Sequence, residues 1–147
     1  MRAFTLLEFT IILGIICILT LLALPKLAPN AQKVSGAADI LRTHLRYAQI
    51  RAQAYGILLG LQNKSNIGYV FFEETPDTHT PLPGCPSPYT LKNSITISNF
   101  LVSFNASGTP CSDHAATKPI QQDVIITLRD GMETETVRIV AATGFVV

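Results

Sequence analysis

The sequence predicts an α+β protein in which a long N-terminal helix packs on a small antiparallel β-sheet or sandwich domain. Three observations lead to this class. Residues 4–24 are almost wholly apolar, residues 34–55 repeat apolar side chains at helical spacing, and the chain after Gly56 has short, β-branched segments bounded by turn residues. Helical segments followed by a run of strands are typical of an α+β fold.

The first segment is long enough to span a bilayer as a helix. From Phe4 to Leu24 the only ionisable side chain is Glu8, and about 20 apolar residues cross the hydrocarbon core. The run is too long for the apolar region of a cleaved secretory signal, and it holds an acid near its start. A carboxylate there carries a large desolvation cost, so Glu8 is a candidate functional residue. The alternative is that Glu8 has no functional role and that its side chain reaches back to the membrane–water interface.

A second helical segment follows two closely spaced prolines, Pro25 and Pro29, where a kink or local unwinding is expected. Its apolar stripe consists of Val34, Ala37, Leu41, Leu45, Ala48, Ala52 and Tyr55. Its opposite side carries Lys33, Arg42, Arg46, Gln49 and Gln53. A weaker line with Ile40 and Tyr47 either widens the core face or faces neighbouring chains. With Gly56 as a plausible stop, we expect one interrupted rod over residues 5–55.

The remaining residues, 57–147, are expected to form the β-domain. Strands are predicted at 57–62, 67–73, 94–98, 101–105, 123–129, 134–141 and 144–147. Residues 63–66 and the pair Asp130-Gly131 are the predicted hairpin turns. Two loops, 75–88 and 106–119, separate the strands, and the first carries five of the nine prolines, which places it on the surface.

Charge and motif content argue against a nucleic-acid-binding protein and against an enzyme. Beyond Lys26, nine basic residues face nine acidic ones, whereas phosphate binding depends on clustered Lys and Arg. The three histidines have no accompanying Ser or Cys nucleophile motif or phosphate-binding glycine loop. No catalytic residue and no cofactor is therefore expected.

The cysteines leave three possibilities open. Cys85 and Cys111 lie in the two polar loops, and an oxidising compartment favours a disulfide between them, which would stabilise the fold by about 3 kcal/mol. A reducing compartment favours two free thiols. A zinc site is the third possibility, with irregular spacing in its first half, and it would use His79, Cys85, Cys111 and His114.

The segment Phe4-Thr5-Leu6-Leu7-Glu8 resembles the mature start of type IV pilins and type II secretion pseudopilins. The resemblance implies that residues 1–3 are a leader, that a prepilin peptidase cuts between Ala3 and Phe4, and that the new amine of Phe4 is methylated. It also implies that Glu8 pairs with this amine during docking into a filament. Pro25 falls where a proline is common in the family. Ala3 is a departure, because the family usually has Gly before the cut.

The downstream pattern resembles the GspH/FimT family of minor pilins and pseudopilins. It is carried by Val102-Ser103-Phe104, by Asn-Ala-Ser-Gly at 105–108 and by Thr143-Gly144. The resemblance implies the pilin fold, with residues 4–29 as the transmembrane and filament-core half of the first helix, 30–56 as its amphipathic half and 57–147 as a β-rich head. Members implicated in DNA uptake carry basic residues after the last Gly, and this chain has residues 145–147, Phe-Val-Val, instead.

The resemblance implies a non-enzymatic subunit of a type IV pilus or a type II secretion pseudopilus that acts in filament initiation or at the tip. Its partners would be other pilins or pseudopilins, the prepilin peptidase and an inner-membrane assembly platform. It would cross the inner membrane once, with the head outside the cytoplasm, before joining the filament, and loops 75–88 and 106–119 would face outward. The alternatives are a FimT-like DNA-binding minor pilin and an unrelated membrane-anchored β-domain for a small ligand.

Overall fold

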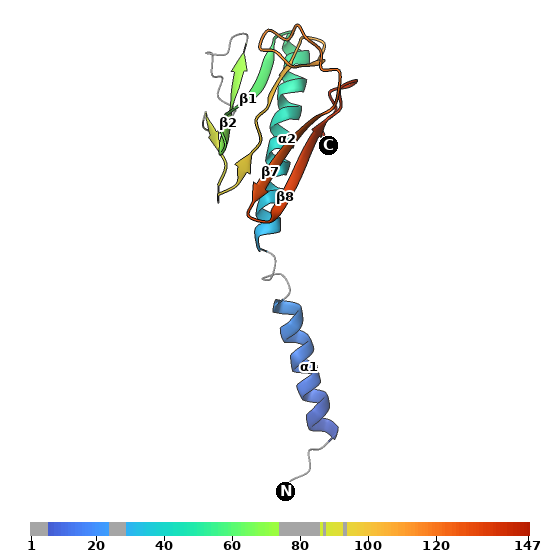
Figure 1. Cartoon of the computed structure of the whole chain (residues 1–147). Helices are drawn as coiled ribbons and strands as arrows, with labels where there is room; N and C mark the ends of the chain where they lie inside the picture. Colours follow the sequence, from blue (N-terminus) through green and yellow to red (C-terminus); the bar gives the residue numbers. More distant parts are fainter. Residues whose placement is uncertain (1–5, 24–28, 74–85, 87, 93) are drawn as a thin grey trace.

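The computed structural model describes residues 6–23, 29–73, 86, 88–92 and 94–147. Helix α1 covers Leu6–Ala23 and helix α2 covers Pro29–Tyr55. Helix α1 lies beyond the N-terminal end of α2 and outside the globular head, which α2 and the strands form (Figure 1). Pro25 falls outside the described residues, so the predicted kink, and with it the interrupted rod, stays a prediction.

Helix α2 ends where the sequence predicts. Gly56 has a φ of 66°, a left-handed conformation that glycine adopts without steric cost. The backbone N–H of Ile57 then donates to the carbonyl of Ala52 at 3.2 Å, which is the bond that closes a Schellman motif. Pro29 occupies the first turn, where its missing N–H removes no helical hydrogen bond.

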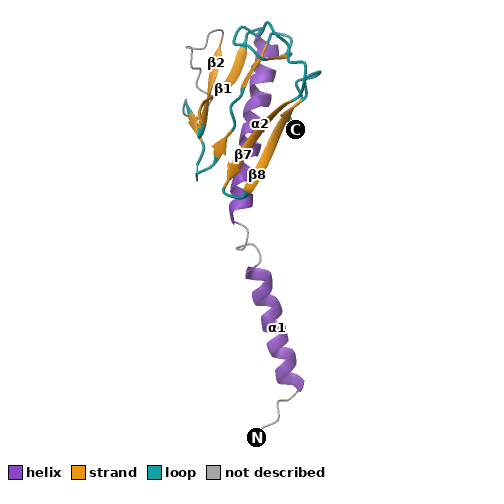
Figure 2. Ribbon diagram, viewed as in Figure 1, coloured by secondary structure: helices purple, strands orange, loops and turns teal. Residues whose placement is uncertain are grey.

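The strands of the head form two antiparallel sheets (Figure 2). The strands are β1 (Leu59–Ser65), β2 (Gly68–Glu73), β3 (Tyr89–Thr90), β4 (Thr96–Ile97), β5 (Leu101–Phe104), β6 (Pro110–Cys111), β7 (Val124–Asp130) and β8 (Glu133–Ile139). One sheet has the order β3-β2-β1-β5-β6 and the other the order β4-β7-β8. In the view of Figure 2, β1 and β2 lie on one side of α2, and β7 and β8 on the other.

Most predicted strands are present with shifted ends, and two predictions at this level, the first turn and the second loop, are wrong. The first hairpin turns at residues 66–67 rather than 63–66, because β1 continues through a register shift after Asn63. The expected loop 106–119 contains β6, whose two residues are buried. The expected strand at 144–147 is present in part. Val146 forms an antiparallel bridge with Ile139, and Val147 and Arg138 exchange backbone hydrogen bonds at 2.8 and 3.0 Å. The short strand β3 was not predicted.

The core lies between α2 and the two sheets. The α2 residues Val34, Ala38, Leu41, Leu45, Ala48 and Ala52 are fully buried, and they meet the inward-facing residues of both sheets, among them Leu61, Phe104, Ile126, Leu128 and Val137. The predicted stripe is therefore confirmed at most positions. There are two exceptions. Tyr55 is 73% exposed, and Ala37 is only partly buried whereas its neighbour Ala38 is fully buried.

Candidate assembly surface on helix α1

Helix α1 exposes apolar side chains all around its circumference. Every residue from Leu6 to Thr20 is exposed, and the large apolar side chains of this stretch are between 41% (Ile12) and 84% (Leu6) accessible. A helix that is apolar on all sides is normally buried in lipid or in protein. Exposed apolar surface of this extent marks an interaction site.

The polar groups of α1 divide into two kinds. The hydroxyl of Thr10 donates to the carbonyls of Leu6 and Leu7 at 3.1 and 2.9 Å, and the hydroxyl of Thr20 bonds in the same way to the carbonyls three and four residues before it. These hydroxyls are satisfied within the helix, which suits an apolar environment. Glu8 lies in the first turn and is the one acidic or basic residue of α1. A negative charge at this end of a helix is favoured by the helix dipole.

Several predicted functional positions lie outside the described residues, namely Ala3, Phe4, Pro25, His79 and Cys85. Cleavage, methylation and the role of Glu8 therefore stay predictions. Among the described residues, no helix reaches the length and apolar character that crossing a membrane requires.

Cys111 and His114 have separate local partners in the structure. Cys111 carries a buried free thiol, and its Sγ donates to the carbonyl of Thr109 at 3.6 Å. Burial, with Asp113 nearby, raises the pKa of this thiol. The Nε2 atom of His114 lies 2.7 Å from Oε1 of Gln62. Among the described residues, no group of three His, Cys, Asp or Glu side chains could hold a metal ion. The disulfide stays a prediction, since Cys85 is not described.

The predicted loop 106–119 is ordered by Asp113. Its carboxylate accepts the hydroxyl of Thr117 at 2.6 Å and the backbone N–H groups of Thr117 and Lys118, the latter at 2.9 Å. The hydroxyl of Thr117 and the N–H of Lys118 lower the pKa of Asp113. The carboxylate of Asp113 therefore closes the turn over residues 113–118 through local hydrogen bonds.

Two glutamines that we expected on the polar side of α2 tie loops to the helix. Nε2 of Gln49 donates to the carbonyls of Gly108 and Thr143 at 3.0 and 3.1 Å, and Nε2 of Gln53 donates to the carbonyl of Ser107 at 3.1 Å. Gly144 has a φ of 68°, and a Cβ there would lie 2.5 Å from Nε2 of Gln49. The 105–108 and 143–144 motifs are thus contact points between loops and helix.

A buried histidine, His44, was not singled out from the sequence as part of the core. Its Nδ1 lies 2.7 Å from the hydroxyl of Tyr69, and its ring meets Tyr69, Phe71 and Tyr89 edge-on at centroid distances of 5.8, 5.5 and 5.2 Å. The signal was its position, about one helical turn from both Leu41 and Ala48, which are fully buried. Burial lowers the pKa of His44 below its ordinary value of 6.5.

The fold should therefore lose stability as the pH falls through the ordinary range of a histidine. Above about pH 6.5 the ring is neutral in both states, whereas below it the unfolded chain binds a proton that the folded chain resists. One such proton changes the free energy of unfolding by at most about 1.4 kcal/mol per pH unit. We expect thermal melts between pH 7 and 5.5 to show this loss, and His44→Gln to reduce the slope. An identical slope in the variant would assign the loss to other groups.

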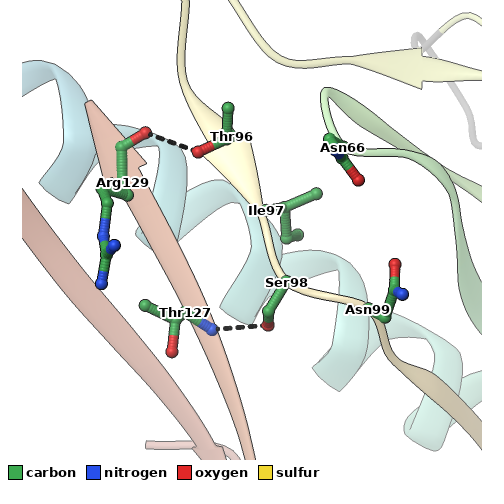
Figure 3. Close-up of a pocket in the computed structure, with 7 residues that line it drawn as sticks. All are labelled: Asn66, Thr96, Ile97, Ser98, Asn99, Thr127 and Arg129. Carbon is green, nitrogen blue, oxygen red and sulfur yellow. Dashed lines mark hydrogen bonds between the residues drawn. The ribbon is translucent and has the colours of Figure 1, made fainter. Parts of the chain in front are cut away.

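A polar cleft of about 540 Å³ lies between β4, β7 and the turn after β1 (Figure 3). Thr96 donates to the carbonyl of Arg129 at 3.2 Å, and the N–H of Thr127 donates to the hydroxyl of Ser98 at 3.0 Å. Arg129 is the one charged side chain among the residues that line it. Among the described residues that line the cleft, no His, Asp or Glu accompanies these hydroxyls.

Comparison with solved structures explains this architecture. The type IV minor pilin FimU of Pseudomonas aeruginosa strain PAO1 matches 79% of this chain and 87% of its own, with a TM-score of 0.59 and 14% sequence identity. The minor pseudopilin EpsH from the type 2 secretion system of Vibrio cholerae matches 78% of this chain and 94% of its own, with a TM-score of 0.57 and 14% identity. The chain has the pilin fold.

A second crystal form of FimU gives the same result, with a TM-score of 0.56 and 15% identity over 77% of this chain and 90% of its own. No protein-family model matches the sequence, and neither does any curated protein. The predicted α+β class is confirmed, including the packing of the amphipathic helix on a small β-domain. Helix α1 extends away from the head, and no described strand of the head packs on it.

Proposed function

We propose that this chain is a minor pilin or pseudopilin of the GspH/FimT type, a non-enzymatic subunit of a type IV pilus or a type II secretion pseudopilus. The pilin fold supports the assignment of this chain to the pilin or pseudopilin class of subunit. Helix α1, exposed and apolar on every side, supports a role in which another apolar surface surrounds it.

The exposed side chains of α1 are the observation that carries the proposal. The run from Phe4 to Leu24 contains one ionisable residue and has the length of a single membrane span. In the inner membrane, lipid would cover this run while the head stays outside the cytoplasm. In a filament, the helices of neighbouring subunits would cover it instead. Transfer between the two environments exposes little apolar surface to water, so the hydrophobic cost of extraction is small.

Glu8 gives this apolar surface a specific docking charge. We propose that a prepilin peptidase cuts between Ala3 and Phe4 and methylates the new amine, and that Glu8 pairs with an amine of this kind during docking. An ion pair in a low-dielectric environment is strong when its geometry is good and is strongly disrupted when one partner is lost. Pro25 would provide the flexible point between the anchor and the head.

The N-terminus of the mature protein tests this proposal. We expect the full chain, purified from the membranes of cells with an active prepilin peptidase, to lack Met1, Arg2 and Ala3 and to begin with methylated Phe4. Intact-mass measurement and N-terminal peptide sequencing report both changes. Cells without the peptidase provide the control, in which the leader should remain. An intact leader in both strains would contradict the proposal.

A further inference from the structure

The side of the sheet β4-β7-β8 that faces away from α2 carries hydroxyl groups and arginines. Strand β4 pairs with β7 so that Ile97 lies opposite Leu128, and both of these residues are buried in the core. Because side chains alternate along a strand, the residues on either side of this pair point outward. These outward residues, all exposed or half-buried, are Thr96, Ser98, Thr127 and Arg129.

Strand β8 continues the same pattern. Its residues Thr134, Thr136 and Arg138 are exposed. The first two lie opposite Arg129 and Thr127 of β7, so they share the outward side of the sheet. We call this surface the hydroxyl–arginine face, and it consists of Thr96, Ser98, Thr127, Arg129, Thr134, Thr136 and Arg138.

The β7–β8 hairpin keeps its acidic residues off this face. Glu135 pairs with Leu128, which is fully buried on the side of α2. Glu133 pairs with Asp130, two residues further along each strand. These three acids therefore alternate with the outward residues and lie on the other side of the sheet. The hairpin thus separates its carboxylates from its arginines.

The two arginines of the face have little internal pairing. Within the part of the chain that the structure describes, no carboxylate lies within ion-pair distance of Arg129. Nε of Arg138 lies 3.9 Å from Oδ2 of Asp123, and an exposed pair at this distance contributes little. Arg129 lies opposite Thr134, four residues before Arg138, so the two arginines are about 14 Å apart along the strands.

The cleft of about 540 Å³ forms one corner of the hydroxyl–arginine face. In Figure 3, Thr127 and Arg129 extend from β7, and Ser98 directly follows β4. The hydroxyl of Ser98 accepts the N–H of Thr127 and retains an O–H donor of its own. The side-chain amides of Asn66 and Asn99 complete the lining. Neutral hydrogen-bonding groups and one guanidinium therefore meet at this corner.

These groups suit a ligand with many hydroxyls and few negative charges. Nucleic acid carries a charge about every 3.4 Å along each strand and is bound by clustered Lys and Arg, whereas this face has two separated arginines. Protein interfaces centre on aromatic and apolar anchors, and among the described outward residues of the three strands the one large apolar side chain is Ile125. A saccharide with carboxylate groups matches both features of the face, because guanidinium groups bind carboxylates bidentately.

We propose that the hydroxyl–arginine face binds an acidic saccharide. Its carboxylates would lie on Arg129 and Arg138, and its hydroxyls would pair with the threonine hydroxyls between them. The cleft beside Arg129 would receive one end of the ligand. The face lies on the head, so this binding is independent of the apolar contacts that the proposed function assigns to α1.

Titration of the full chain, purified in detergent, with an oligogalacturonate tests this proposal. This ligand carries a carboxylate on each sugar unit, and its methyl ester is the matched control, because it keeps the sugar and loses the charge. We expect the acid to bind about tenfold more tightly than the ester. Binding of the acid should weaken as the salt concentration rises, since the two charges of each contact are exposed. Isothermal titration calorimetry measures both effects.

Substitutions on the face provide the second arm of this experiment. Arg129→Gln and Arg138→Gln should each weaken binding about tenfold, because a hydrogen bond to a charged group is lost, and should reduce its salt dependence. Thr127→Val should weaken binding several-fold and leave the salt dependence unchanged. Arg51→Gln, on α2 and outside the face, should bind as the natural chain does. Thermal melts of each variant identify any loss of fold.

Four results would overturn the proposal. Equal binding of the acid and its methyl ester would show that the arginines are not used. Tighter binding of duplex DNA at equal total charge would indicate a nucleic-acid surface instead. Binding unchanged in both arginine variants would place the ligand elsewhere. No binding by a chain that begins with methylated Phe4 and enters the filament would reject the saccharide site and leave the proposed function standing.

Discussion

Glu8→Gln should nearly abolish entry of this chain into the filament while the chain still reaches the membrane. The substitution keeps the size of the side chain and one acceptor oxygen, and it replaces the charged carboxylate with a neutral amide. Losing one partner of an ion pair in a low-dielectric environment costs about 3–5 kcal/mol, which corresponds to a loss of about 100-fold or more. The ratio of chain in the filament fraction to chain in the membrane fraction measures the effect.

Thr10→Val is the matched control for this prediction. Thr10 lies two residues further along α1 and is also polar, but its hydroxyl bonds within the helix to Leu6 and Leu7. Its loss should therefore leave the ratio close to that of the natural chain. If both variants enter the filament equally well, or if both fail equally, the charge of Glu8 has no specific role.

Leu45→Ala should produce the largest loss of stability that we predict for the head. Leu45 is fully buried at the centre of the α2 stripe, and truncating a buried leucine costs about 2–5 kcal/mol. Loss of this size is a large part of the stability of a small domain and should lower its Tm by about 10 °C or more. Circular dichroism melts of the full chain in detergent provide the measurement.

Ile40→Ala, on the same helix, separates burial from helix propensity. Ile40 is 41% exposed, so its truncation removes less buried surface than truncation of Leu45. Both variants introduce alanine into the same helix, so the helix propensity of the new residue is the same. We expect a loss of stability well below that of Leu45→Ala. Equal losses would show that the packing of α2 on the two sheets does not set the stability of the head.

The helical part of the fold could be predicted because its signals are local. Apolar spacing located the buried stripe, and Gly56 marked the end of α2 through its own backbone preference. Tyr55 was misplaced because periodicity describes a helix without saying where the sheets that cover it end. His44 was missed as a core residue because its burial depends on Tyr69, Phe71 and Tyr89, which are distant in sequence.

The β-domain was less predictable because its details depend on contacts between distant segments. Strand β6 is a buried edge strand of the five-stranded sheet, although Pro110 and the polar residues around it are typical of a loop. The contacts of Gln49 and Gln53 with the 105–108 and 143–144 loops required both the helix and the loops to be placed. Of the candidate site, Glu8 was found from the cost of an acid in an apolar run, whereas the position of α1 outside the head is visible only in three dimensions.

The central claim is that the apolar surface of α1 passes from lipid to neighbouring helices, and photocrosslinking from α1 tests it most directly. A photoreactive amino acid at Leu13, an exposed position on α1, would be irradiated in cells with and without the assembly platform. The account predicts covalent adducts with other pilin or pseudopilin chains when the platform is present, and their loss in its absence and in the Glu8→Gln variant. Protein adducts that are missing in all cells, or that are unchanged by the platform and by Glu8→Gln, would contradict it.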